Sequence, residues 1–158
     1  AGPAGCGKSM LRSVARQFGV PDTFEARCCP CGHWNDPRYD CRCTAAQIRR
    51  HLARFPDTEI TVEVPPVPAR EWQSKAKGTS NADIRRQLEE MGAIPPLTLD
   101  EAGSELLRTA ASEHGLSAAE LDRAMRIAAT IAALDRSDRI GVSHVCEAIN
   151  YRPRWRCG

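Results

Sequence analysis

The sequence predicts an α-rich fold with a minor β element. The region after Ser80 carries four amphipathic segments with residues that can cap helices at their starts. One segment, residues 59–64, alternates apolar and polar residues with the period of two that is typical of a half-buried strand. Aromatic residues make up only 5% of the chain, so a core must consist mainly of Ala, Leu, Ile and Val.

Composition and charge exclude several classes of protein. The chain has 158 residues, of which 42% are hydrophobic and 27% charged, which is typical of a globular rather than a disordered protein. It has no apolar run of about 20 residues and no apolar segment after a basic start, so we expect a cytoplasmic protein without a membrane partner. A formal net charge of +2 gives the whole chain no strong case for binding nucleic acid, although a local basic patch remains a candidate.

The first element is a glycine-rich loop followed by a helix predicted over residues 9–18. Residues 2–9 read GPAGCGKS and match the phosphate-loop pattern G-x-x-x-x-G-K-[ST] at every position. In this pattern backbone amides surround a phosphate, Lys8 reaches the β- and γ-phosphates, and Ser9 holds Mg²⁺. The motif predicts a site for nucleotide phosphates and Mg²⁺, against the alternative of a chance glycine-rich stretch. The candidate nucleotide-binding residues are Gly2, Gly5, Cys6, Gly7, Lys8 and Ser9.

A working phosphate loop also needs an acidic residue, at the end of a second strand, that holds the Mg²⁺-bound water. The candidate is the segment 97–101, Leu-Thr-Leu-Asp-Glu, which has only two apolar residues and follows two prolines. Within it, Thr98 and Glu101 instead favour a capping box at the start of a helix. The sequence therefore predicts a phosphate loop without a clear catalytic carboxylate, and it indicates no catalytic residue.

A cysteine-rich segment follows. The chain has eight cysteines and no secretory signal, which favours reduced thiols or a metal site over a disulfide framework. The pattern C-x-C-x9-C-x-C can close a tetrahedral, structural zinc site, and its members are Cys29, Cys31, Cys41 and Cys43. The residues expected to form the turn between the two pairs are Asn35, Asp36, Pro37 and Arg38. Two spare ligands, Cys28 and His33, leave the ligand set open, and the alternative is a cluster of reduced surface thiols.

The next elements are a helix from about Thr44 to Arg54 and the strand over residues 59–64. Three prolines follow the strand and end it, because proline cannot donate a hydrogen bond to a ladder. The stretch that they begin is rich in Pro, Lys, Gly and Ser, as a linker is. We therefore divide the chain into an N-terminal region, a linker and a helical region, over residues 1–64, 65–80 and 81–152.

Four helices are predicted after the linker. Ser80 or Asn81 caps the first, which ends near Met91 and has Ile84 and Leu88 on its inner face. The second begins at the Thr98 capping box and ends near His114, where Gly115 closes it.

The third predicted helix begins at a capping box of Ser117 and Glu120 and runs to about Asp135. Its apolar stripe consists of Leu121, Met125, Ala128, Ile131 and Ala132. The fourth is opened by Ser143 and carries Val145, Cys146 and Ile149, and short connections between the four predict a small bundle.

Three stretches of the sequence resemble one family. The run CPCGHWNDPRYDCRCTAAQIRRHLARF (29–55), continued by ITVEVPPVP (60–68), is similar to the magnesium-chelatase-like AAA+ ATPases of the ComM/YifB type. Residues 115–152 resemble the C-terminal helical lid of that family, and GPAGCGKSML (2–11) resembles its Walker A segment. The resemblance implies an incomplete P-loop AAA+ core joined to a four-helix lid. It also implies ATP-dependent ring assemblies with a helicase or translocase role in DNA uptake and recombination.

The sequence departs from this family at elements that contact the γ-phosphate. Between Phe18 and Arg27 it has eight residues, where the family carries most of its nucleotide-binding core with Walker B. Residues 55–59 contain no Arg where the family has one before its VEVP strand, and Ala119 fills the position of the sensor Arg of the lid. We therefore expect a truncated or decayed relative, or the product of an interrupted reading frame, that binds ATP and hydrolyses it weakly or not at all.

Two functions are compatible with these observations. The first is an ATP-binding AAA+ protein that acts in a homo-oligomeric ring or with a full-length homologue. The second is a non-enzymatic, zinc-stabilised helical interaction module that docks on a full-length homologue or on DNA. In the second, the tail offers cations and an aromatic ring for phosphate contact and base stacking, against the alternative of a frayed basic terminus. These tail residues are Arg152, Arg154, Trp155 and Arg156.

Overall fold

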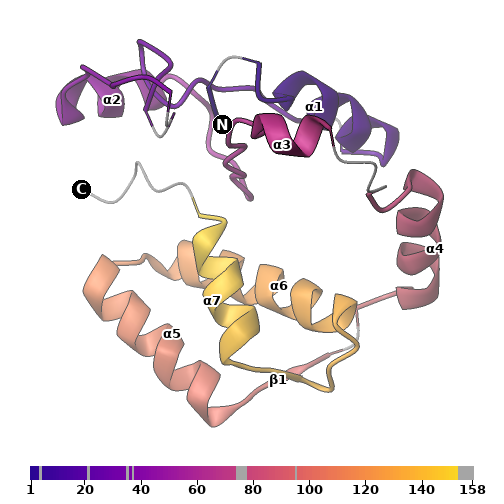
Figure 1. Cartoon of the computed structure of the whole chain (residues 1–158). Coiled ribbons are helices and arrows are strands. Elements are labelled where there is room, and N and C mark those ends of the chain that lie inside the picture. The colour runs from indigo at the N-terminus through magenta and orange to yellow at the C-terminus, as the bar shows by residue number, and fades with distance from the viewer. Residues whose placement is uncertain are drawn as a thin grey trace. The chain divides into compact units, whose positions relative to one another are not determined.

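The computed structural model describes most of the chain, namely residues 1–3, 5–20, 22–34, 36, 38–73, 78–94 and 96–152. These residues form two compact units, one within residues 1–74 and the other within residues 75–152 (Figure 1). Helices predominate, and the sheet has two short parallel strands. The predicted α-rich class with a minor β element is therefore confirmed. Within the described ranges, every helix is too short or too polar to span a lipid bilayer.

The N-terminal unit contains helices α1 (Lys8–Gln17), α2 (Ala45–Leu52) and α3 (Ala69–Trp72). Helix α1 begins directly after Gly7, whose φ of 90° lies in the left-handed region that glycine adopts without strain. Helix α2 begins at a capping box in which Thr44 Oγ1 accepts a hydrogen bond from Gln47 N (3.3 Å) and Thr44 N donates to Gln47 Oε1 (2.9 Å). The last residue of α2, Leu52, is buried at 1% exposure and is the largest fully buried side chain described in this unit.

Residues 59–64 do not form the regular strand that the alternation predicts. Instead, Val64 N donates to Ala1 O (2.8 Å), and the Ala1 amino group donates to Val62 O. This is the pattern of a parallel ladder, but the partner in it is a single residue, so the ladder does not extend. The side chain of Val62 stays 42% exposed. The segment therefore anchors the start of the chain rather than contributing a strand to a sheet.

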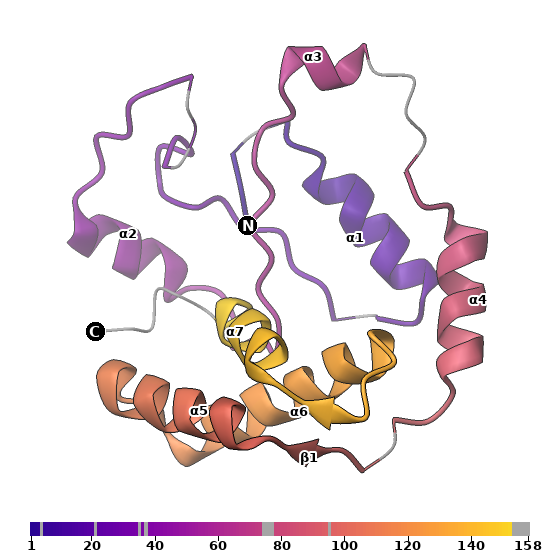
Figure 2. The same ribbon diagram turned by 60° about the horizontal axis from the view of Figure 1, so that its bottom comes forward.

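The C-terminal unit contains α4 (Asn81–Met91), β1 (Thr98–Leu99), α5 (Glu101–His114), α6 (Ala118–Leu134), β2 (Arg139–Ile140) and α7 (Val142–Asn150). Helix α7 lies across α5 and α6, and β1 runs along one end of this group (Figures 1 and 2). The two strands are parallel, with Thr98 opposite Arg139 and Leu99 opposite Ile140. All four helices predicted after the linker are thus present.

The core of this unit lies between α6, β2 and α7. Its buried members are Ile127, Ala128, Ile131, Ala132, Ile140, Val145 and Ala148. Small and branched aliphatic side chains fill it, as the low aromatic content indicates, and they allow close approach of the helices. Cys146, which the predicted fourth helix carries, is exposed, whereas Val145 and Ala148 form the buried face of α7. On α4, Leu88 is 41% exposed, so its predicted inner face is only partly covered.

Several predicted helix ends are confirmed. Ser80 Oγ accepts from Asp83 N (3.1 Å) at the start of α4, and Ser117 Oγ accepts from Glu120 N (3.3 Å) at the start of α6. Helix α5 ends at Gly115, which has a φ of 60° and a ψ of 40°.

Two predicted helix starts are wrong. Thr98 pairs with β2, so α5 begins only at Glu101, and its cap is Asp100, whose Oδ1 accepts from Gly103 N (2.6 Å). Helix α7 begins one residue before Ser143, and its first turn is closed by His144 Nδ1, which accepts from Gly141 N (3.0 Å). In both cases the short parallel sheet fixes the backbone immediately before the helix and moves the cap.

Candidate functional site

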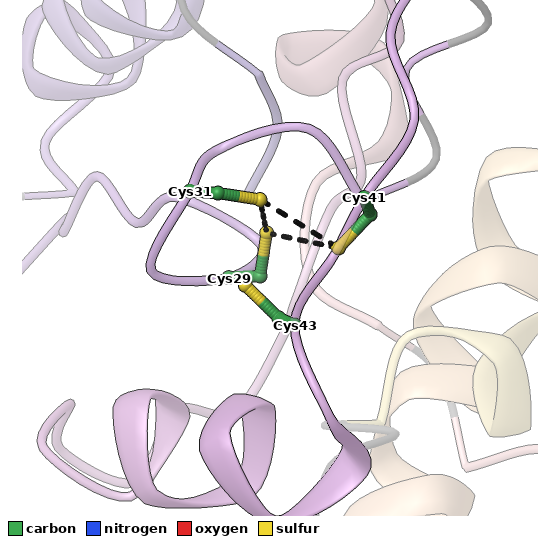
Figure 3. Close-up of side chains that lie close together, drawn as sticks. All are labelled: Cys29, Cys31, Cys41 and Cys43. Atoms are coloured by element: carbon green, nitrogen blue, oxygen red, sulfur yellow. Dashed lines mark hydrogen bonds between the residues drawn. The ribbon is translucent and has the colours of Figure 1, made fainter.

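Four thiols converge in the N-terminal unit (Figure 3). The Sγ atoms of Cys29, Cys31, Cys41 and Cys43 all lie within 4.8 Å of one another. Cys29 Sγ is 3.3 Å from Cys31 Sγ and 3.7 Å from Cys41 Sγ, and the Cys31 and Cys41 sulfurs are 3.6 Å apart. The structure therefore brings together all four cysteines of the C-x-C-x9-C-x-C pattern.

The spacing of these sulfurs suits a tetrahedral metal ion. Thiolate sulfurs bound at about 2.3 Å to a tetrahedral zinc ion lie about 3.8 Å apart. The three distances of 3.3, 3.7 and 3.6 Å are close to this value, so an ion fits with small side-chain movements. Four protein sulfurs would fill all the positions of such an ion, which makes the site structural rather than catalytic.

The backbone around the first cysteine pair holds it in a tight turn. Gly32 N donates to Cys29 O (3.1 Å), and Gly32 has a φ of 82°, which favours glycine at this position. Trp34 N donates to Cys29 Sγ (3.3 Å). A backbone N–H that donates to a ligand atom helps to orient that atom toward a metal.

Asp36 and Arg38 hold the loop between the two cysteine pairs. Arg38 Nε donates to Asp36 Oδ1 (2.9 Å) and an Arg38 terminal nitrogen donates to Oδ2 (2.8 Å), so the pair is bidentate. The Asp36 side chain is nearly buried, at 2% exposure. The hydrogen bonds from Arg38 lower the pKa of Asp36 to about 2. These two residues lie in the turn as predicted, whereas Asn35 and Pro37 are outside the described residues.

The thiols differ in their tendency to ionise. A hydrogen bond from the His33 backbone, together with the neighbouring Cys29 thiol, lowers the pKa of Cys31 to about 6. Although the Cys43 backbone amide lowers the pKa of Cys41, burial and the adjacent thiols raise it to about 12. The lowered pKa of Cys31 favours its thiolate, the form that binds metal, whereas a dication bound at Cys41 would have to replace a thiol proton.

The two spare ligands do not join the group. Cys28 Sγ donates to Trp34 O (2.9 Å), and burial raises the pKa of this thiol to about 11. The ring of His33 packs beside Tyr39, with 4.8 Å between the ring centroids. The geometry therefore favours the four cysteines over the wider ligand set that the sequence left open.

The phosphate loop leads into α1 and is tied down on two sides. Gly2 N donates to Ala26 O (3.2 Å), while Ala1 is hydrogen-bonded to the 62–64 segment. A Cβ at Gly2 would lie 2.3 Å from Val64 O, so no larger residue fits beside this anchor. Gly5 and Gly7 have φ values of 74° and 90°, which fold the loop back toward the start of the helix.

The polar side chains of the loop point toward its own backbone and toward Glu25. Lys8 Nζ donates to Pro3 O and lies 3.6 Å from Cys6 Sγ, so its ammonium group is folded over the loop. Ser9 Oγ donates to Glu25 Oε2 (2.8 Å). Sequence analysis missed Glu25, because no pattern links it to the loop and the contact depends on how the chain folds back after α1.

Other residues considered from the sequence are elsewhere. Asp100, in the candidate acidic strand, caps α5 in the C-terminal unit. Ala119 lies in the first turn of α6 and offers no cation. The tail residues Arg154, Trp155 and Arg156 fall outside the described residues.

Comparison with known proteins identifies a family. The family described as magnesium chelatase, subunit ChlI C-terminal, matches residues 58–152, which is more than half of the chain. The matched region begins before the anchor segment 62–64 and includes all the helices and strands of the C-terminal unit. Comparisons with curated proteins and with solved structures gave no match.

Proposed function

The chain belongs to the magnesium chelatase ChlI C-terminal family, within the magnesium-chelatase-like AAA+ proteins, and from this premise we propose that it binds ATP with Mg²⁺ through its phosphate loop. The observation that carries the proposal is the anchoring of the loop between Ala26 and the 62–64 segment. A phosphate loop binds anions only when its amides are held in a concave array, and hydrogen bonds on both sides supply that support. The amides lead into the N-terminus of α1, a position that favours negative charge.

The residues present fit an ATP-binding role better than a hydrolytic one. Phosphoryl transfer is accelerated almost entirely by positioning and by stabilising the charge of the transferred group. Residues 55–59 carry no Arg, and Ala119 stands where the resemblance places a sensor Arg, so two sources of that charge are missing. We therefore expect binding of Mg²⁺-ATP with weak or negligible turnover.

Equilibrium binding of a fluorescent ATP analogue to the full chain tests this proposal. Lys8→Ala removes the ammonium group that reaches the phosphates and should abolish most of the binding. Arg49→Ala is the matched control, because it removes one positive charge from an exposed position of α2 in the same unit. Equal binding by the wild type and Lys8→Ala, or no binding by the wild type, would rule out the phosphate loop as a nucleotide site.

A second candidate function is a zinc-stabilised module without enzymatic activity. It is favoured by the convergence of four cysteine sulfurs within 4.8 Å. A bound zinc ion would cross-link the two cysteine pairs and so stabilise the segment that contains them. The stabilised segment would present α2 and the neighbouring loops as a surface for a full-length homologue or for DNA. Elemental analysis of the purified full chain should give about one zinc per chain, as a closed four-sulfur site predicts.

The matched variants for the zinc site are Cys41→Ser and Cys146→Ser. The first removes a member of the cluster, and the second removes an exposed thiol on α7. Only Cys41→Ser should lose zinc. Loss of zinc from both variants, or from neither, would contradict assignment of the metal to the four-cysteine group.

The family also suggests how the protein acts. We propose that it assembles in a homo-oligomeric ring, or with a full-length homologue, in ATP-dependent work on DNA of the ComM/YifB kind. Sedimentation of the full chain with and without Mg²⁺-ATP tests the assembly. If the chain sediments as a monomer with and without Mg²⁺-ATP, both alone and mixed with DNA, the proposed assembly and its work on DNA are contradicted. The proposed ATP binding would not be affected by that result.

A further inference from the structure

Glu25 lies beside Ser9, the residue of the phosphate loop that the motif predicts to hold Mg²⁺. Its Oε2 accepts a hydrogen bond from Ser9 Oγ (2.8 Å), and its Oε1 is 3.4 Å from a terminal nitrogen of Arg12. Ser9 and Arg12 are three residues apart on α1, so they share one face of the helix. Two contacts, one on each oxygen, therefore fix the orientation of the Glu25 carboxylate against the start of α1.

The spacing of the two oxygens suits a shared magnesium ion. Mg²⁺ binds oxygen at about 2.0–2.1 Å in octahedral geometry, which places neighbouring ligands about 2.9 Å apart. Ser9 Oγ and Glu25 Oε2, at 2.8 Å, already have this separation. On binding of the cation, the Ser9 hydroxyl would rotate so that its proton no longer points at the carboxylate. Ser9 Oγ and Glu25 Oε2 would then both offer lone pairs to the cation.

The surroundings leave room for a hydrated ion and for phosphates. An open hollow of about 410 Å³ lies against this face of α1, and Ser9, Arg12 and Glu25 all line it. Arg12 Nε is buried without a hydrogen-bond partner among the described residues. The hydrogen bonds from Ser9 and Arg12 lower the pKa of Glu25, which keeps the carboxylate ionised at neutral pH.

We propose that Glu25, together with Ser9, coordinates the Mg²⁺ of a bound Mg²⁺-nucleotide and so supplies the carboxylate for which the sequence offered no clear candidate. Arg12 positions the carboxylate through its second oxygen. This inference rests on the proposed ATP binding and adds a chain-specific metal ligand to it. It predicts that the magnesium dependence of nucleotide affinity, rather than nucleotide binding itself, depends on Glu25.

The test compares the affinity of the full chain for ribose-labelled fluorescent ADP in Mg²⁺ and in EDTA. The wild type should bind about tenfold more tightly in Mg²⁺. Glu25→Gln should lose this gain and keep the affinity measured in EDTA, which also shows that its loop is intact. Glu71→Gln is the matched control, because it removes one exposed carboxylate from α3 in the same unit, outside the loop and its anchor, and it should keep the full gain.

A second set of variants tests whether Ser9 and Glu25 act on the same ion. Ser9→Ala should also lose the magnesium gain, and the Ser9→Ala, Glu25→Gln double variant should lose no more than either single variant. Additive losses, or a Glu25→Gln variant with the wild-type gain, would overturn the assignment. If Glu25→Gln does not bind ADP in EDTA, the Glu25→Asp variant is measured instead. Its shorter side chain should give a smaller gain in affinity from Mg²⁺ than the wild type, and an unchanged gain would overturn the assignment.

The outcomes separate this inference from the function on which it rests. A wild type that binds ADP equally in Mg²⁺ and in EDTA would overturn the role of Glu25 while leaving nucleotide binding in place. A wild type that binds in neither buffer would overturn both.

Discussion

Gly103 lies in the first turn of α5, where the helix passes the end of the short sheet. A Cβ there would be 2.9 Å from Asp100 Oδ1 and 3.0 Å from Leu99 Cδ1. Asp100 cannot easily move aside, because the same oxygen caps the helix through Gly103 N. Alanine normally favours a helix over glycine by about 1 kcal/mol, so the local preference and the packing oppose each other here.

We expect the packing to dominate at this position. Gly103→Ala should lower the free energy of unfolding by about 1–2 kcal/mol, as overpacking usually does. Gly78→Ala is the matched control, because a Cβ at Gly78 meets nothing within 4 Å, and its effect should stay within about 0.5 kcal/mol. Urea denaturation followed by circular dichroism measures both. A more stable Gly103→Ala variant would show that Asp100 and Leu99 yield to the added methyl group.

Asp36 lies in the loop between the two cysteine pairs and is not a member of the four-sulfur group. Asp36→Asn should weaken zinc binding about tenfold, because it breaks the bidentate pair with Arg38 that shapes the loop between the cysteine pairs. Asp40→Asn, an exposed change of the same charge in the same loop, should leave the affinity unchanged. Competition with a chromogenic chelator measures the three affinities. Equal affinities for the wild type and Asp36→Asn would contradict a supporting role for the pair.

The same pair has a definite pH dependence. The folded pKa of Asp36 is lowered to about 2, so its contribution to stability is present above the ordinary value near 3.8 and is lost only as pH falls toward 2. The ratio of zinc affinities between the wild type and Asp36→Asn should therefore be constant from pH 8 to pH 5.5. Both affinities should fall over this range, because protons compete with zinc for thiolates.

At the scale of single residues, the sequence predicts a site when residues of suitable chemistry lie close together in the chain at a characteristic spacing. The phosphate loop and the C-x-C pairs are local patterns, so their members could be named before their geometry was known. Glu25 could not, because its contact with Ser9 spans 16 residues and depends on the path of the chain after α1. Cys28 could not be set aside from sequence either, since only the fold shows its thiol bonded to a backbone carbonyl.

Among the elements, helices with a strong local cap were predicted most closely. The capping box of Ser117 and Glu120 opens α6 as expected. The box proposed for Thr98 failed because pairing of β1 with β2 outweighed it, and a two-residue parallel strand leaves no periodic signal in the sequence. The 59–64 alternation is real, but its partner is the single residue Ala1, so it forms an anchor and no strand.

The caps of α6 and α7 give a matched pair of serine substitutions. Ser117→Ala should lower the free energy of unfolding by about 1 kcal/mol, because Ser117 Oγ accepts from Glu120 N at the first turn of α6. Ser143→Ala should have little effect, because Ser143 is exposed and the first turn of α7 is closed by His144. Thermal denaturation measures both. Equal losses in the two variants would indicate that Ser143, and not His144, caps α7.

The whole molecule divides its stability unevenly between its two units. The buried core described above lies in the C-terminal unit. Among the described residues up to 73, the buried apolar side chains are Pro3, Cys6, Cys28, Cys29 and Leu52. An apolar core this small rarely supports a fold alone, and small domains of this kind commonly depend on a structural metal.

Removal of metal should therefore unfold one unit and spare the other. A structural zinc ion contributes about 10 kcal/mol or more to the folding of a small site, which is comparable to the whole stability of a domain. Hydrogen exchange of the reduced full chain, with and without a zinc chelator, measures this by segment. Residues 28–52 should lose protection in the chelator, whereas α6 and α7 should keep theirs because their core contains no metal ligand.

The Cys41→Ser variant makes the cause of that loss specific. If chelation acts through the cluster, this variant should already exchange rapidly over residues 28–52 and should show no further change in chelator. Parallel loss of protection in α6 would mean that the C-terminal unit depends on the metal as well. Unchanged protection over residues 28–52 would mean that this segment is held by its own hydrogen bonds and packing, without a metal at the cysteines.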